Sequence, residues 1–100
     1  MKNFRYHVVS GGKVVATSPT GGGAMKAIYT LQYAKHIPPA KRIPLDQPIF
    51  IREQCVCGGN DHVPWQARFY DAAGDRISDP ATVPDAERYA PLKPAPEVGP

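Results

Sequence analysis

Alternation of apolar and polar side chains at the start of the chain predicts a β-hairpin. In residues 4–10, one face of an extended strand collects large apolar side chains, because successive side chains of a strand point to opposite faces. These side chains are Phe4, Tyr6 and Val8. A second strand-like run covers residues 13–18, and Gly11 and Gly12 separate the two runs. Glycine readily adopts the positive φ angles of a two-residue turn, so the sequence predicts two antiparallel strands joined there.

The apolar positions then change to helical spacing between Gly23 and His36. At about 100° per residue, one arc of this segment holds small and aliphatic side chains that suit close packing on a sheet. This arc consists of Ala24, Ala27, Ile28, Leu31 and Ala34. A second, half-polar arc consists of Met25, Tyr29, Gln32, Tyr33 and His36. Two prolines, Pro38 and Pro39, end the helix, because proline lacks an N–H and disfavours helical backbone before it.

Strand-like segments return in the second half of the chain. Residues 49–57 read as one strand, and residues 63–70 alternate with the period of a half-buried strand. That alternation places Trp65 and Phe69 in the core. Turn residues follow, and then a short strand at residues 76–78. The order β-β-α-β-β-β predicts an α+β fold, in which an antiparallel sheet of four to five strands has one helix packed on one face.

One hundred residues form a single small domain, and the proline distribution suggests where it ends. Six of the twelve prolines follow residue 79, so we expect one α+β domain over residues 1–79 and a proline-rich extended or mobile tail over residues 80–100. The 42% hydrophobic content excludes general disorder, and a core of this size excludes a deep cofactor cavity. No apolar run approaches the ~20 residues of a membrane span, and the first residues have no signal-peptide pattern. The sequence therefore predicts a soluble, cytoplasmic protein with no membrane contact.

The hairpin and the helix also support a family resemblance. Residues 12–18 read Gly-Lys-Val-Val-Ala-Thr-Ser, and the helix that follows contains Ala-Met-Lys-Ala-Ile at residues 24–28. This arrangement, which covers about a third of the chain, resembles the YegP-like small bacterial proteins, which carry a glycine turn, a similar strand and then a helix. The chain departs from that pattern at residues 19–21, where Pro-Thr-Gly replaces an aromatic residue, and in a helix without a central glycine. The family has no settled activity, so the resemblance implies only the β-β-α arrangement.

Charge is distributed unevenly along the chain, whose net charge is +3. Residues 1–45 carry seven lysines and arginines and no acid, whereas residues 46–100 carry five against nine aspartates and glutamates. A segment of one sign predicts a positive field over part of the surface, which speeds association with polyanions or acidic proteins. The alternative is that the folded chain interleaves these cations with the later acids.

A candidate binding surface lies on the helix and the loop that follows it. Its residues are Lys26, Tyr29, Tyr33, Lys35, His36, Lys41 and Arg42. Aromatic faces stack on bases or anchor protein interfaces, and cations hold phosphates or carboxylates. The alternative is that the tyrosines pack half-buried against the sheet edge or the proline-rich loop.

The turn before the helix is a second candidate, for an anion. Thr20, Gly21, Gly22 and Gly23 would present backbone N–H groups at a helix start to a phosphate or carboxylate, helped by Lys26. No Gly-Lys-Ser/Thr follows, so this is not a Walker motif. The alternative is a flexible connector in which Thr20 or a glycine caps the helix.

A metal site is the third candidate. Three soft ligands, Cys55, Cys57 and His62, come close together if the chain turns after the strand. A structural zinc ion needs a fourth ligand. That ligand would be His7, His36 or Asp61. Only one imperfect ligand pair is present, so we favour two buried cysteines that act as small hydrophobes in a reducing compartment, with no cofactor.

These observations favour a non-enzymatic protein. No serine or cysteine lies in a nucleophile motif, and a core this small rarely forms a concave pocket. We expect a binding module that uses the basic, tyrosine-bearing surface to bind nucleic acid or an acidic protein. The alternatives are a phage or mobile-element accessory or inhibitor protein, for example anti-CRISPR-like, which blocks a partner's surface, and a small zinc protein. An open sheet edge would also allow a homodimer by strand pairing.

Overall fold

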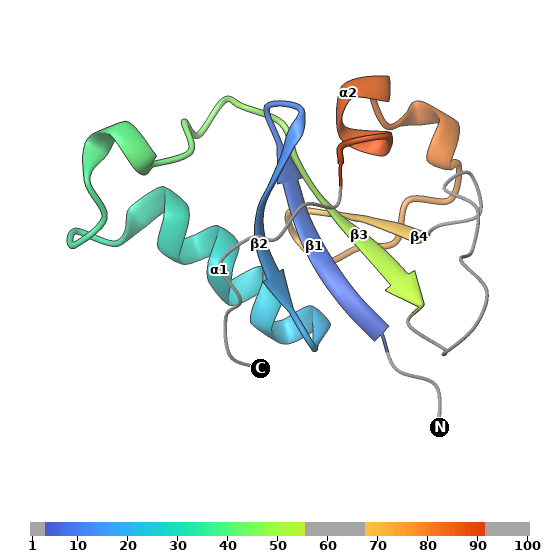
Figure 1. Ribbon diagram of the computed structural model, residues 1–100, viewed down its shortest axis with the longest axis horizontal. Coiled ribbons are helices and arrows are strands. Elements are labelled where there is room, and N and C mark those ends of the chain that lie inside the picture. The colour runs from blue at the N-terminus through green and yellow to red at the C-terminus, as the bar shows by residue number, and fades with distance from the viewer. Residues whose placement is uncertain (1–3, 56–67, 92–100) are drawn as a thin grey trace.

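Four strands form one antiparallel sheet in the computed structural model, which describes residues 4–55 and 68–91. In sheet order they are β2 (Lys13–Ser18), β1 (Phe4–Ser10), β3 (Ile49–Cys55) and β4 (Arg68–Asp71). A thirteen-residue helix, α1 (Gly21–Tyr33), packs on one face of this sheet (Figure 1). The predicted α+β class is therefore confirmed, with four strands and one helix against them.

The β1–β2 hairpin has the predicted two-glycine turn. Gly11 and Gly12 have φ angles of 62° and 76°, the positive values that glycine adopts without strain. The pairing register shifts between Val8 and Val9, which leaves Val15 as the extra residue of a bulge in β2. Since β1 pairs with β3 on its other side, β2 is an edge strand of the sheet.

The main core lies between the sheet and α1. The buried face of the helix uses small and aliphatic residues, as the helical spacing predicts: Ala24, Ala27 and Ile28. They pack on the sheet residues Val8, Ala16, Ile49 and Ile51. Within the described ranges, no helix has the length and apolar character that crossing a membrane requires.

Helix α1 begins and ends earlier than the predicted residues 23–36. Thr20 is the N-cap, and its side-chain oxygen accepts the backbone N–H of Gly23 at 3.0 Å. The first two glycines therefore already lie in the first turn. At the other end, Ala34 has extended backbone angles (φ −65°, ψ 127°), so the helix stops before the two prolines rather than at them.

The opposite face of the sheet buries a second apolar cluster. Val9 and Phe69 are fully buried, and Val9 points away from α1 because its neighbour Val8 packs on the helix. The C-terminal segment contributes Val83 and Ala90, which are also buried. This segment contains two short helices, η3 (Pro80–Thr82) and α2 (Asp85–Arg88). Figure 1 shows α2 on the other side of the β1–β2 hairpin from α1.

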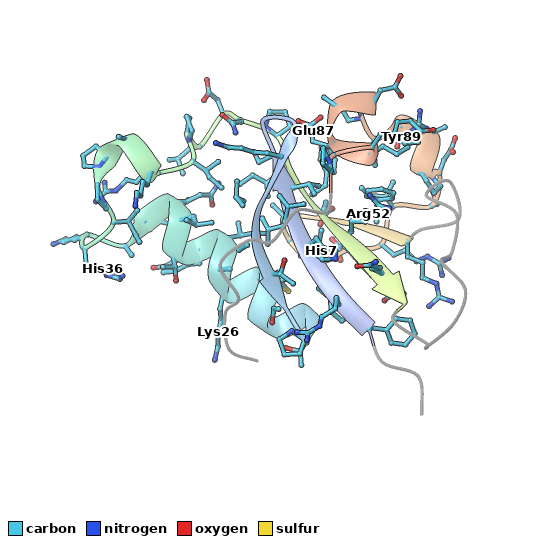
Figure 2. The ribbon with its side chains drawn as sticks, in the orientation of Figure 1. His7, Lys26, His36, Arg52, Glu87 and Tyr89 are labelled. Carbon is cyan, nitrogen blue, oxygen red and sulfur yellow. The ribbon has the colours of Figure 1, made fainter. Side chains whose placement is uncertain are left out.

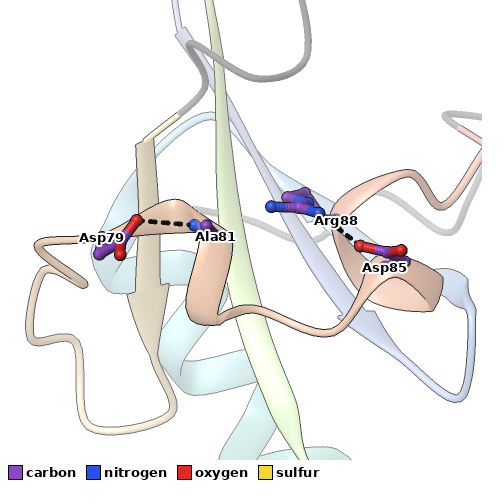
Figure 3. A network of polar contacts seen from close by, with 4 residues as sticks. All are labelled: Asp79, Ala81, Asp85 and Arg88. Atoms are coloured by element: carbon purple, nitrogen blue, oxygen red, sulfur yellow. Dashed lines mark hydrogen bonds and ion pairs between the residues drawn. The ribbon is translucent and has the colours of Figure 1, made fainter.

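Local polar contacts stabilise each of the two short helices. The carboxylate of Asp79 caps η3 by accepting the N–H of Ala81 at 3.0 Å, and Arg88 pairs with Asp85 one turn earlier in α2 (Figure 3). The buried Glu87 side chain accepts the N–H of a turn glycine, Gly12, at 3.3 Å. The segment is thus anchored to the hairpin as well as to the sheet.

The prediction of an extended or mobile tail from residue 80 is therefore corrected for residues 80–91, which belong to the folded unit. The apolar contacts of the segment come from isolated residues between prolines and acids. Such contacts have neither the helical nor the strand period, so the hydrophobic pattern did not reveal them. The last part of the predicted tail, residues 92–100, lies outside the described residues.

The end of the sheet agrees with only part of the sequence pattern. Phe69 is fully buried, as predicted. The short strand predicted at residues 76–78 is reduced to one isolated bridge, between Tyr70 and Arg76. The remaining predictions for residues 56–67, which include the predicted core tryptophan, lie outside the described residues.

Candidate functional site

Tyr29 and Tyr33 form an exposed pair on the outer face of α1. They are four residues apart and therefore lie on one side of the helix, with ring centroids 5.0 Å apart and ring planes inclined by 40°. Tyr29 is 67% exposed and Tyr33 is 51% exposed. Both rings thus point away from the sheet, in contrast to the alternative in which they pack against it. Tyrosine supplies a large contact area at low conformational cost, which suits a binding surface.

Exposed lysines accompany the tyrosine pair. They are Lys26 on α1, and Lys35 and Lys41 on the segment that follows. None of these three lysines forms an ion pair with a carboxylate that the structure describes. Ion pairs in the described part of the chain join later residues, Arg68 with Glu53 and Arg88 with Asp85. Figure 2 shows Lys26 pointing outward from α1. The exposed His36 lies just beyond the end of α1, and both residues are remote from Glu87.

Arg42 has a structural role at the end of the helix. Its guanidinium donates one hydrogen bond to the carbonyl oxygen of Ala34 at 3.1 Å and another to that of Ile37 at 3.2 Å. These carbonyls follow α1, where the chain leaves the helix and needs donors. Arg42 therefore ties the loop after the short helix η1 (Pro39–Lys41) to the end of α1, while its charge stays at this end of the molecule.

A groove separates β2 from the loop that carries Lys41 and Arg42. It is open to solvent and has a volume of about 640 Å³. Its apolar lining includes Val15, Leu31 and Ile43, and its cations are Lys13, Lys41 and Arg42. The loop is held beside the helix by a hydrogen bond from the N–H of Ile43 to the carbonyl oxygen of Leu31 at 3.1 Å. Among the described residues, no acid lines the groove.

The predicted anion loop serves as a helix cap. The side chain of Thr20 accepts the N–H of Gly23, and Thr20 donates its own N–H to the hydroxyl of Ser18 at 3.3 Å. Gly21 and Gly22 form the start of the helix. The capping alternative therefore describes the local geometry, and an anion at this turn stays a prediction.

The predicted metal site falls on residues outside those that the structure describes, so it stays a prediction. The side chain of Cys55, and all of Cys57 and His62, lie outside them. Of the two described candidates for a fourth ligand, His7 has both ring nitrogens in hydrogen bonds and His36 lies at the end of α1, remote from it in Figure 2. Within these residues there is no group of three metal-binding side chains.

His7 is a buried polar residue that the sequence analysis considered only as a metal ligand. It lies on the sheet face opposite α1 and is 7% exposed. Nε2 lies 2.7 Å from Oε1 of Gln54, an amide oxygen that accepts its hydrogen, and Nδ1 lies 2.9 Å from the hydroxyl of Thr17, which donates to it when the ring is neutral. Burial lowers the pKa of His7; the hydrogen bond to Gln54 opposes this, and the nearby charges of Arg52 and Arg5 lower the pKa further.

Glu53 is the centre of a second polar cluster, on the α1 side of the sheet. Its carboxylate accepts the hydroxyl of Tyr70 at 3.0 Å and lies 3.7 Å from the guanidinium of Arg68. Burial raises the pKa of Tyr6 and of Tyr70, and Glu53 raises both further. An adjacent pocket of about 180 Å³ is lined partly by Tyr6, Tyr70 and Met25. Since the carboxylate already has partners, this cluster stabilises the sheet and offers no free acid or base.

Sequence reasoning found the helix side of the surface but missed the groove. The tyrosines and lysines of α1 were accessible to it because helical spacing separates the packed arc from the outer arc. Lys13 was not included, since its proximity to Lys41 depends on how the loop folds back beside β2. A lysine in a strand next to a glycine turn is a weak signal of an edge.

Comparisons with known proteins give no match. No protein-family model, no curated protein and no solved structure is significantly similar to this chain. The resemblance of residues 12–28 to YegP-like proteins therefore stays a prediction.

Proposed function

We propose that this protein is a non-enzymatic binding module that holds an acidic partner protein through the basic, tyrosine-bearing surface. This surface consists of Lys26, Tyr29, Tyr33, Lys35, His36 and Lys41, together with the groove that Lys41 borders. Arg42 contributes charge to it and positions the loop.

One observation carries the proposal: the exposed, mutually tilted pair of Tyr29 and Tyr33 lies among lysines without described acidic partners. Tyrosine is enriched at protein interfaces and dominates their binding energy, whereas unpaired lysines supply long-range attraction. Residues 1–45 contain no carboxylate that would weaken this attraction from within the same segment.

A protein partner is favoured over nucleic acid because of the groove. Its described apolar lining is aliphatic, from Val15, Leu31 and Ile43, without the aromatic platforms on which bases stack. Aliphatic floors suit the side chains of a polypeptide. Nucleic acid is therefore the competing outcome of the test.

The test compares two fluorescent probes by anisotropy: an aspartate- and glutamate-rich peptide, and a single-stranded oligonucleotide. We expect the peptide to bind to the protein. We expect the double variant Tyr29→Ala/Tyr33→Ala to lower the affinity for the peptide by roughly tenfold or more, as the loss of an interface anchor does. Tyr89→Ala is the matched control, because Tyr89 is equally exposed but lies in the C-terminal segment.

Lysine variants complete the test. We expect the double variant Lys26→Gln/Lys35→Gln to lower the affinity for the peptide. Arg76 is also an exposed cation, and we expect Arg76→Gln to leave this affinity unchanged. Tighter binding of the oligonucleotide, with a loss of about tenfold or more between 50 and 200 mM salt, would show a nucleic-acid binder instead. Equal affinity of all variants for the peptide would contradict the proposed surface.

A further inference from the structure

The outer edge of β2 has no strand beside it among the residues that the structure describes, although the rest of the sheet is paired in the order β2-β1-β3-β4. An edge strand presents backbone N–H and C=O groups to any extended chain of suitable shape. The other edge, β4, differs, because the bridge between Tyr70 and Arg76 covers part of it. The free edge is therefore on the side of the sheet that carries the groove.

The hairpin geometry shows which backbone groups are available. Ser10 and Lys13 flank a two-residue turn and pair with each other, so they form the hydrogen-bonded pair of the hairpin. The next pair, Val9 and Val14, is then of the non-hydrogen-bonded type, whose backbone groups point away from the partner strand. The N–H and C=O of Val14 thus point outward, on a residue that lines the groove.

We propose that an extended acidic peptide of the partner protein adds to β2 as a further strand and lies in the groove between β2 and residues 40–47. This inference rests on the proposed function and specifies how the partner is held. Backbone hydrogen bonds to β2 would supply affinity, and the groove would select side chains.

Charge complementarity identifies the occupant as acidic. The groove is bordered by Lys13, Lys41 and Arg42, and the part of its lining that the structure describes contains no acid. A second copy of this chain would bring the same cations to the groove and be repelled. The lysine and the bulge of β2 are features that discourage indiscriminate edge pairing, so they restrict the edge to a partner of opposite charge.

The groove also defines a sequence pattern for the peptide. Successive side chains of a strand alternate between its two faces, so every second peptide residue would face the aliphatic lining of Val15, Leu31 and Ile43. The residues between them would lie near the cations of the rim. Because β2 is six residues long, the paired segment is expected to have about six residues that alternate apolar with acidic side chains.

The test uses a peptide probe of alternating valine and glutamate, about eight residues long. The probe is compared with two methylated versions of the same peptide, one methylated on the backbone nitrogens of its valines and the other on those of its glutamates. Methylation removes the N–H donors on one edge of the peptide but leaves its charge and side chains unchanged. We expect one of the two methylation patterns to weaken binding by about tenfold, the loss of a few backbone hydrogen bonds. We also expect the amide of Val14 to become protected from hydrogen exchange in the complex.

Protein variants give an independent result. Val14→Pro removes the outward N–H and is tolerated at an edge strand whose N–H faces solvent, whereas Val14→Thr keeps the N–H and the branched shape. We expect Val14→Pro to bind the probe peptide about tenfold more weakly than Val14→Thr does. Should Val14→Pro unfold the protein, Lys41→Glu, an exposed site, is expected to give a similar loss.

Failure of this inference is distinguishable from failure of the proposed function. If both methylation patterns bind as well as the unmodified probe and the tyrosine variants still weaken it, the acidic partner is held without strand pairing and the inference is overturned. If no peptide binds, the proposed function itself fails. A dimer whose Val14 amide is protected without peptide would also overturn the inference, because a second copy would then occupy the edge.

Discussion

At the scale of single residues, His7 makes the stability of the fold depend on pH. Burial lowers its pKa from the ordinary value of 6.5, and its ring is neutral in hydrogen bonds with Gln54 and Thr17. Below that value the unfolded chain takes up a proton that the folded protein does not, so stability falls as the pH falls through and below about 6.5. Above it His7 is neutral in both states and contributes no pH dependence.

We therefore expect the free energy of unfolding to decrease between pH 7 and pH 5, by at most about 1.4 kcal/mol per pH unit from this residue. Urea unfolding at both values measures it. The variant His7→Gln, which cannot titrate, is expected to lose less stability over the same interval. An identical decrease in both proteins would contradict the role given to His7.

Two glycines provide a matched pair of predictions on backbone strain. Gly74 has a φ of 88°, and a Cβ there would lie 2.7 Å from the sulfur of Met25. Gly22 has no positive φ, lies in the first turn of α1 and has open space at its Cβ position. We expect Gly74→Ala to lower the free energy of unfolding by about 1–2 kcal/mol and Gly22→Ala to raise it slightly. Thermal unfolding of the two variants checks this, and a stabilised Gly74→Ala would contradict it.

At the scale of elements, the sequence patterns succeeded where one face of an element is buried and the other is exposed. The β1–β2 hairpin and the packed arc of α1 followed from period two, period 3.6 and two glycines. The bounds of α1 differed because the side chain of Thr20 caps the helix and because the backbone of Ala34 is already extended, and hydrophobic spacing reports neither. The groove could not be foreseen, because it depends on the path of residues 38–47 past an edge strand.

The structure of the C-terminal segment was even less predictable from the hydrophobic pattern. Helices of three and four residues are not stable alone, so its two short helices depend on contacts with the rest of the fold. Val83 is 1% exposed and joins the cluster behind the sheet, so we expect Val83→Ala to cost roughly 2 kcal/mol of stability by leaving a cavity.

The matched control for this segment is Ala81→Ser at an exposed position of η3, which we expect to change stability by less than about 0.5 kcal/mol. Chemical denaturation of both variants measures the difference. If Val83→Ala is as stable as the control, the segment does not cover the sheet as described.

At the scale of the whole molecule, the two faces of the sheet have different roles. The face behind the sheet is closed by residues 79–91 and holds buried polar groups such as His7 and Glu87. The α1 side presents the exposed tyrosine pair and, at its edge, the cationic groove beside β2. The exposed lysines of residues 26–41 thus lie on the same side of the molecule as the tyrosine pair, which is the basis of the proposed binding role.

The measurement that tests this account most directly is a map of backbone amide shifts, by NMR of labelled protein, on titration with the alternating valine–glutamate peptide. We expect the perturbed amides to lie in residues 13–17 of β2 and in residues 26–43, with the amides of residues 79–91 unchanged. Perturbations confined to residues 79–91, or an unchanged spectrum at saturating peptide, would contradict the assignment of the binding surface.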